Sequence, residues 1–424
     1  MIERFHNSIR RGRGWLALVV LLSLVLASTS PAFGQKKKKG EPEKPTPMVG
    51  IDIRKIVWPQ PPNIARIRYQ AYYAGEKLPD FNAKTKTKGG WMDRVAGVSE
   101  DKGPDAALRN HFFMGEPHGV AVDSKGKVYA ADGKVGAIFI IDTETRDTQM
   151  IKNGKNANFK LIMGLAIDDN DRLFVADAQA RHVLVFSAVH SMESVISEGI
   201  VDPVGLAIDT ENRFLYVADV GLDQVLVYDA DSFKLLRKIG TTGKNHTLTT
   251  PGDFAKPSAV AVDRDGNLFV ADMLNARIEI FDADGNFIRT FGKRGDGPGY
   301  FAMPKGVAID SDGHVWVADA MQNRVQVYSQ EGQLLIYMGS GQGILPGQFS
   351  GLQDIAIDKQ NRVFTSEVFP GRVQQFRYVT QAEAAEEYKR EAEKDKAAGR
   401  KSVQASQPAT SLEQDAKARD SAAK

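Results

Sequence analysis

A pattern of six residues occurs six times along this chain of 424 residues, and it constrains the fold more than any other feature. Clear copies read GVAVDS, GLAIDD and GVAIDS, and a second strand-like segment such as LFVAD follows each copy. The copies lie 41 to 54 residues apart, as measured between their aspartates: Asp123, Asp168, Asp209, Asp263, Asp310 and Asp358. Because larger apolar residues alternate with alanine, each copy is expected to form a β-strand. A period of about 40–50 residues made of short strands is typical of propeller blades.

We therefore predict an all-β fold, a six-bladed β-propeller of four-stranded antiparallel blades that spans residues 51–379. The sixth blade ends after its third strand, near residue 379. The segment NIARIRYQAYYAG at 63–75 has the character of a fourth strand and precedes the first repeat. We expect this N-terminal strand to close the last blade, because closure removes the open sheet edges that would otherwise aggregate.

Residues 1–34 have the features of a signal peptide. Four arginines precede a nearly unbroken apolar stretch at 15–27, and small residues at 32 and 34 suit cleavage before Gln35. The alternative is a retained membrane anchor, but 13 apolar residues are fewer than the roughly 20 that a span needs. The chain has no cysteine, which excludes a lipoprotein anchor and disulfides. These features predict a bacterial periplasmic or secreted protein.

The flanking segments differ in composition from the repeats. Residues 35–50 form a basic, Pro-rich linker, 77–116 an insertion before the first repeat, and 380–424 a charged tail, partly helical or disordered. The formal net charge is +2, but the signal and the linker carry three net positive charges each and the tail carries none. The predicted propeller therefore carries a net charge of −4. Nucleic-acid binding needs a positive surface, so we predict no nucleic-acid partner.

The recurring acidic residues have a structural interpretation. Each repeat aspartate is followed by a turn such as DSKG or DRDG, in which aspartate accepts backbone hydrogen bonds and glycine takes the positive φ angle. A calcium site is the alternative, but no copy has the glycine and glutamate spacing of an EF-hand loop. A second set of acids ends the VAD segments, with arginines such as Arg277 nearby. We interpret these pairs as bracing between blades.

The complete unit, F-x-x-P-x-G-V-A-[VI]-D…[LV]-[FYW]-V-A-D…N-x-R-[VI]-x-[VI]-[FY], resembles the NHL repeat. The copies at 254–281 and 301–328 match it best, and the resemblance extends over about 56–379 to secreted bacterial six-bladed NHL-type proteins. The resemblance implies a platform that binds protein or RNA. One branch, the peptidyl-hydroxyglycine lyases, is a zinc enzyme with histidines near the axis, and related six-bladed lactonases use calcium.

The candidate site follows from the path of the chain. Each repeat enters its first strand at P-x-G and returns at VAD, so both ends should line one mouth of the central channel. The variable residue of P-x-G differs between blades, and we predict a binding face at His118, Met163, Ser258, Lys305 and Gln353. Such a mixed surface suits a peptide, a protein loop or a small organic ligand.

The sequence offers little for catalysis. A zinc site needs three or four converging ligands, whereas this ring has one histidine, His118, beside Glu116. There is no G-x-S-x-G motif and no P-loop. We therefore predict no catalytic residue, metal ligand or cofactor, and a monomeric, exported scaffold that binds an envelope protein, a peptide or a small ligand. The alternative is a metal-dependent lyase or hydrolase with a divalent ion in the channel.

Overall fold

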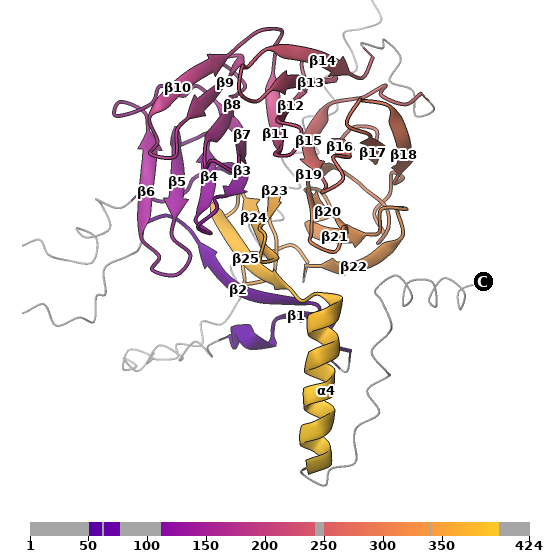
Figure 1. The fold of residues 1–424 in the computed structure, drawn as a ribbon. Coiled ribbons are helices and arrows are strands. Elements are labelled where there is room, and N and C mark those ends of the chain that lie inside the picture. The colour runs from indigo at the N-terminus through magenta and orange to yellow at the C-terminus, as the bar shows by residue number, and fades with distance from the viewer. Residues whose placement is uncertain (1–50, 62, 77–111, 242–249, 340, 398–424) are drawn as a thin grey trace, which may run out of the picture. The chain divides into compact units, whose positions relative to one another are not determined.

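The computed structural model describes residues 51–61, 63–76, 112–241, 250–339 and 341–397, whose strands form six antiparallel sheets arranged in a ring (Figure 1). The predicted all-β, six-bladed propeller is therefore confirmed. The expected signal peptide at 1–34, the linker at 35–50, most of the insertion at 77–116 and the end of the tail lie outside the described residues.

Five blades hold four strands each, which follow one another from the axis outward. The first blade contains β3 (Pro117–Val122), β4 (Val128–Asp132), β5 (Ala137–Ile141) and β6 (Thr148–Lys152). The second contains β7 (Ile162–Ile167), β8 (Leu173–Asp177), β9 (His182–Phe186) and β10 (Met192–Ile196). The third contains β11 (Pro203–Asp209), β12 (Phe214–Asp219), β13 (Gln224–Asp229) and β14 (Leu235–Ile239).

The next two blades repeat this arrangement. The fourth contains β15 (Pro257–Val262), β16 (Leu268–Asp272), β17 (Arg277–Phe281) and β18 (Phe287–Phe291). The fifth contains β19 (Pro304–Ile309), β20 (Val315–Asp319), β21 (Arg324–Tyr328) and β22 (Leu334–Met338). In each of these five blades the second strand ends in a buried aspartate: Asp132, Asp177, Asp219, Asp272 and Asp319.

The sixth blade joins the two ends of the propeller. Its own strands are β23 (Leu352–Ile357), β24 (Arg362–Glu367) and β25 (Arg372–Tyr378). A short 3-10 helix, η1 (Ile53–Lys55), leads into β1 (Val57–Trp58) and β2 (Ile67–Tyr73), and β2 pairs with β25. Figure 1 shows the indigo β2 beside the yellow β25. The predicted closure by an N-terminal strand is confirmed, and β1 adds a fifth strand to this sheet.

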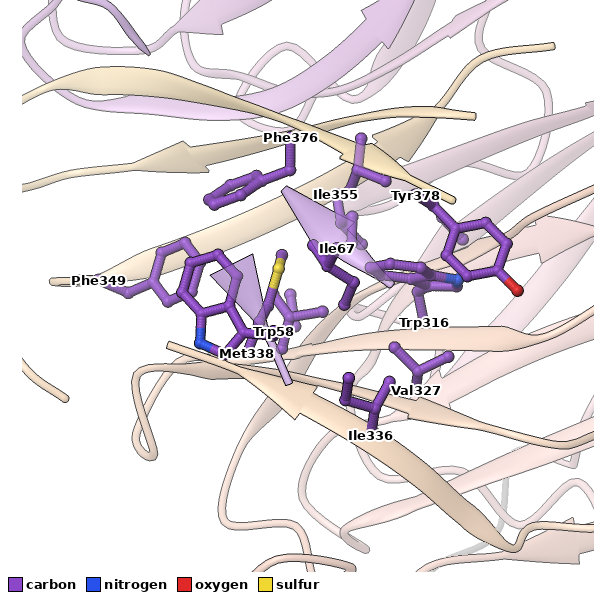
Figure 2. Packing of buried hydrophobic residues seen from close by; sticks show 14 of the residues in the cluster. Trp58, Ile67, Trp316, Val327, Ile336, Met338, Phe349, Ile355, Phe376 and Tyr378 are labelled. Atoms are coloured by element: carbon purple, nitrogen blue, oxygen red, sulfur yellow. The ribbon is translucent and has the colours of Figure 1, made fainter. Parts of the chain in front are cut away.

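The closing strands complete a hydrophobic core between the fifth and sixth blades (Figure 2). Trp58 of β1 packs edge-on against Phe376 of β25, with ring centroids 5.8 Å apart. Ile67 of β2 is fully buried in the same cluster, which also includes Trp316 of β20. Four buried hydrophobic side chains come from this segment, Trp58, Ile67, Tyr69 and Tyr73. The N-terminal segment is therefore part of the core.

The innermost strands contact one another around the whole ring, from β3 through β7, β11, β15 and β19 to β23 and back to β3. Glycine is required where their backbones approach most closely. A Cβ atom at Gly119 would lie 2.2 Å from the carbonyl oxygen of Met163, and one at Gly164 would lie 2.3 Å from that of Val204. No side chain fits at these distances, so the repeated glycine fixes the spacing of adjacent blades.

The turn aspartates act as the sequence predicts. Asp263 accepts hydrogen bonds from the backbone N–H groups of Asp265, at 3.0 Å, and Asn267, at 2.9 Å. Corresponding bonds form at the other five copies: Asp123, Asp168, Asp209, Asp310 and Asp358. Turn formation therefore accounts for these carboxylates.

The acids at the VAD ends correct one expectation, because their bonds run within a blade. The buried Asp177 accepts hydrogen bonds from the N–H groups of Lys160, at 2.7 Å, and Leu161, at 2.9 Å, which lead directly into β7 of the same blade. Arg277 pairs at 2.8 Å with Asp272 of its own blade. These carboxylates hold the incoming connection of each blade in place, and do not pair one blade with the next.

The segment of helical composition in the tail forms α4 (Gln381–Ala397). Two ion pairs join its first half to the sixth blade, Arg377 to Glu383 at 2.6 Å and Arg68 to Glu387 at 2.5 Å. In the part of the chain that the structure describes, no helix has both the length and the apolar character needed to cross a membrane.

Deletion of residues 51–76 should abolish cooperative folding. The deletion removes four buried hydrophobic side chains, each worth about 1.5–3 kcal/mol, so the loss of roughly 6–12 kcal/mol approaches the stability of a whole domain. Thermal unfolding followed by circular dichroism measures the effect. The matched control lacks only residues 51–55, none of which is buried, and should unfold within a few degrees of the full chain. Equal melting temperatures for both deletions would contradict a structural role of β2.

Candidate functional site

All five predicted binding residues line one cavity of about 220 Å³ on the axis of the ring. Each of the six innermost strands contributes to its wall. The cavity wall includes the variable residue of the P-x-G segment from all six blades: His118, Met163, Val204, Ser258, Lys305 and Gln353. Of the residues that follow the VAD ends, Val220 and Met273 also line the cavity. The structure thus brings together the residues that sequence reasoning selected.

A bulge in each blade aims these side chains at the axis. In every pairing of first and second strands, the register shifts at or next to the variable residue, as between Pro257 and Ala259 and between Pro304 and Gly306. A bulged residue is released from the regular alternation of the strand, so its side chain can point in a direction that a regular ladder does not allow. The repeat therefore presents one freely variable side chain per blade to the channel.

Three polar side chains meet in one sector of the cavity. The ammonium of Lys305 on β19 donates a hydrogen bond to Gln353 Oε1 on β23, at 2.7 Å. His118 on β3 lies in the neighbouring blade, and its Nδ1 atom is buried and has no hydrogen-bond partner. Burial, and then the positive charge of Lys305, lower the pKa of His118. Burial also lowers the pKa of Lys305. Burial and the charge of Lys305 thus both favour the neutral form of the His118 imidazole.

Asp354 occupies the position that is glycine in four other blades. Its side chain enters the gap between β23 and β3, where Oδ2 accepts a hydrogen bond of 3.0 Å from the backbone N–H of Val120. Burial raises the pKa of Asp354 to about 6. In the same sector, the Ser366 hydroxyl donates a hydrogen bond to the carbonyl oxygen of His118. The contact between the sixth and first blades is thus polar, unlike the glycine contacts that four other blades make.

The remaining polar groups at the wall have partners inside the protein. The Ser258 hydroxyl donates to the carbonyl oxygen of Pro304 in the next blade, at 3.0 Å. Lys256, which the sequence analysis did not select, donates at 2.5 Å to the carbonyl oxygen of Val220 and lies 3.8 Å from the carboxylate of Asp223. Lys256 directly precedes the P-x-G position, and a comparison of that column between the blades could have found it.

A zinc site does not fit the residues of this cavity. Structural and catalytic zinc sites need at least three protein ligands, usually His, Cys, Asp or Glu. Among the residues that the structure describes, no three such side chains lie close enough together to hold an ion. The cavity wall contains two of them, His118 and Asp354, and Asp354 already accepts a backbone hydrogen bond.

A family model and a curated relative each match part of this chain. A family model described as a six-bladed β-propeller matches residues 247–339, which include the fourth and fifth blades. A probable peptidyl-α-hydroxyglycine α-amidating lyase of Caenorhabditis elegans is 40% identical over 91 residues. The matched part is 20% of this chain, and the chain spans about a quarter (24%) of the length of that relative.

Solved structures similar to this chain have low sequence identity to it. A protein of unknown function from Bacteroides thetaiotaomicron has a TM-score of 0.50 and 16% identity, over 62% of this chain and 70% of its own. A streptogramin B lyase has a TM-score of 0.47 and 13% identity, over 62% of this chain and 94% of its own. At such identities the likeness extends to the fold alone.

Replacement of Lys305 should change the titration of His118. We expect the pKa of His118 to lie below 6.5 in the unmodified protein and to rise in Lys305→Met, because that variant lacks a positive charge that opposes protonation of the imidazole. An NMR pH titration of the histidine ring protons measures both values, with His118→Gln used for assignment. Lys125→Met, exposed in the turn that follows β3, is the control. An unchanged or lower pKa in Lys305→Met would contradict the described proximity.

Proposed function

We propose that this chain is an exported binding module of the NHL-repeat type, which takes a ligand or partner at the P-x-G end of its channel. The observation that carries this proposal is the convergence of all six variable P-x-G residues on one cavity. The repeated residues are used otherwise, because the glycines set the blade spacing and the aspartates hold turns and connections. Variation is thus concentrated where a ligand can reach it.

The exposed surface around the cavity mouth supports the same proposal. The turns that follow the VAD ends carry large exposed side chains in three successive blades: Leu274 is 50%, Met321 66% and Phe369 62% exposed. The corresponding turn residues in the first three blades are Lys134, Gln179 and Gly221. The long connections at this end of the blades add exposed Tyr300, Ile344 and Leu345. Large apolar side chains gathered at one face are typical of an interaction surface.

Export is the second part of the proposal. It is supported by the basic and apolar composition of residues 1–34 and by the absence of cysteine from the whole chain. With the signal removed, the protein would act in the periplasm or outside a bacterial cell, as a monomer that meets an envelope protein, a peptide or a small ligand. The net negative charge of the propeller argues against nucleic acid.

A second candidate is a lyase or hydrolase that depends on a divalent ion. The specific observation in its favour is the 40% identity over 91 residues to the probable amidating lyase. The cavity wall does not favour it, because two potential ligands are fewer than a zinc site needs. The binding module is therefore the better supported function.

The binding face can be tested by affinity capture from a bacterial envelope extract. The mature protein is compared with a variant that carries His118→Ala, Lys305→Ala and Gln353→Ala. We expect the variant to recover its specific partners at least about tenfold less well, since loss of buried polar contacts of 1.5–3 kcal/mol reduces affinity by that factor. A matched control carries Lys125→Ala, Lys359→Ala and Gln360→Ala in exposed turns at the opposite end of the blades. Equal recovery by all three proteins would show that the cavity is not the contact.

Elemental analysis separates the two candidate functions. The purified mature protein is dialysed against a metal-free buffer and its zinc and calcium are measured per chain. The binding module predicts far less than one ion per chain, because the described cavity lacks a complete ligand set. One ion per chain that survives dialysis, and is lost in His118→Ala, would support the enzyme instead.

A further inference from the structure

The axial cavity has two unlike halves. His118, Lys305, Gln353 and Asp354 belong to β3, β19 and β23, the innermost strands of three blades that are adjacent in the ring. The opposite half is formed by the second, third and fourth blades and is mainly apolar, with Met163, Leu165, Val204, Leu206, Val220, Val260 and Met273. A ligand that fills both halves must therefore be polar at one end and apolar at the other.

Lys305 is the positively charged side chain of the polar half, and the carboxylate of Asp354 in that half is hydrogen-bonded to the backbone of Val120 instead. Its only hydrogen-bond partner among the described residues is the neutral Gln353, and no carboxylate in that part of the chain lies within 4.0 Å of its ammonium. Lys256, at the other side of the cavity, differs because Asp223 lies near it. A half-buried ammonium without a counter-charge is costly unless a ligand supplies one. The polar half thus favours an anionic group.

The number and type of donors favour a carboxylate over a phosphate. One ammonium matches one negative charge, and the described wall contains no arginine, the side chain best suited to the several oxygens of a phosphate group. The innermost elements are strands, so no helix N-terminus adds positive potential on the axis. A single carboxylate would supply the ion-pair partner that Lys305 lacks among the described residues, while Asp354 keeps its hydrogen bond to Val120.

We propose that the cavity binds a small amphipathic carboxylate, with the carboxylate on Lys305 and a hydrocarbon body against Met163, Val204 and Met273. The cavity volume of about 220 Å³ sets the size of that body, since it lies below the range of pockets for drug-sized ligands, roughly 300–1,000 Å³. This inference rests on the proposed function, because it specifies the ligand of the same cavity. The carboxylate belongs to a free acid or to a short apolar peptide end, and both present the same chemistry.

Calorimetric titration of the mature protein with straight-chain carboxylates, from butanoate to decanoate, tests the proposal. Each added methylene should lower the Kd about fourfold until the cavity is full, after which the Kd should level off. Octanoate should bind at least about tenfold more tightly than octan-1-ol or octylamine, because only the carboxylate pairs with the ammonium. N-acetylated dipeptides that end in leucine are titrated in the same way, with free and with amidated C-termini. Comparison of their affinities with those of the fatty acids distinguishes a peptide end from a free acid as the ligand.

The variants make the assignment specific. Lys305→Met should bring octanoate and octan-1-ol to within about twofold of each other, while Lys125→Met should leave the preference intact. Thermal unfolding of both variants checks that they are folded, and Lys305→Arg should keep most of the preference. If alcohols and amines bind as tightly as carboxylates in every variant, the ligand class is overturned and the cavity remains a binding site. If no probe binds while the capture experiment still depends on the cavity residues, the inference fails and the proposed function stands.

Discussion

The pairing of β2 with β25 is the interaction on which the rest of the propeller depends. The other five blades are continuous segments of chain, but the sixth takes strands from both ends of the repeat region. Without β1 and β2, β25 would present a free edge, and the core around Trp316 and Phe376 would lose Trp58 and Ile67. The ring is closed only when β2 pairs with β25. The positions of all six innermost strands, and therefore of the cavity, depend on this pairing.

Within each repeat, some residues maintain the blade and others are free to vary. Carboxylates at strand ends hold the turns and the incoming connections, and their hydrogen bonds are made with backbone N–H groups. Such bonds do not depend on neighbouring side chains, so the P-x-G residue can vary without loss of the blade. The irregular blade illustrates the limit of this freedom. Where Asp354 replaces glycine, a polar contact with Val120 takes the place of close backbone packing.

Much of this arrangement could be predicted from the sequence because it repeats. Alternation with period two identified the strands, the spacing of the copies identified the blades, and the strand character of residues 63–75 identified the closure. The shared position of His118, Met163, Ser258, Lys305 and Gln353 in the repeat was enough to place them at one mouth.

What the sequence could not provide depends on contacts between blades. Lys256 and Lys305 are both lysines near a P-x-G segment, yet one lies near Asp223 and the other has only Gln353. These partners are 33 and 48 residues away along the chain, respectively. The role of Asp354 likewise depends on Val120, which precedes it by 234 residues. Pairings of this kind are determined by the geometry of the ring, and no local pattern encodes them.

The close approach at the repeated glycines has a consequence for how such a protein can change its specificity. Because Gly119 and Gly164 bring backbone against backbone, the spacing of adjacent innermost strands is determined by main-chain atoms. A substitution at the preceding residue changes the side chain that lines the channel and leaves the spacing of the strands as it was. Two blades have a Cβ atom at the glycine position, at Ala259 and at Asp354. The residue that can vary with the ligand and the residue that fixes the blade spacing are therefore neighbours in the same repeat.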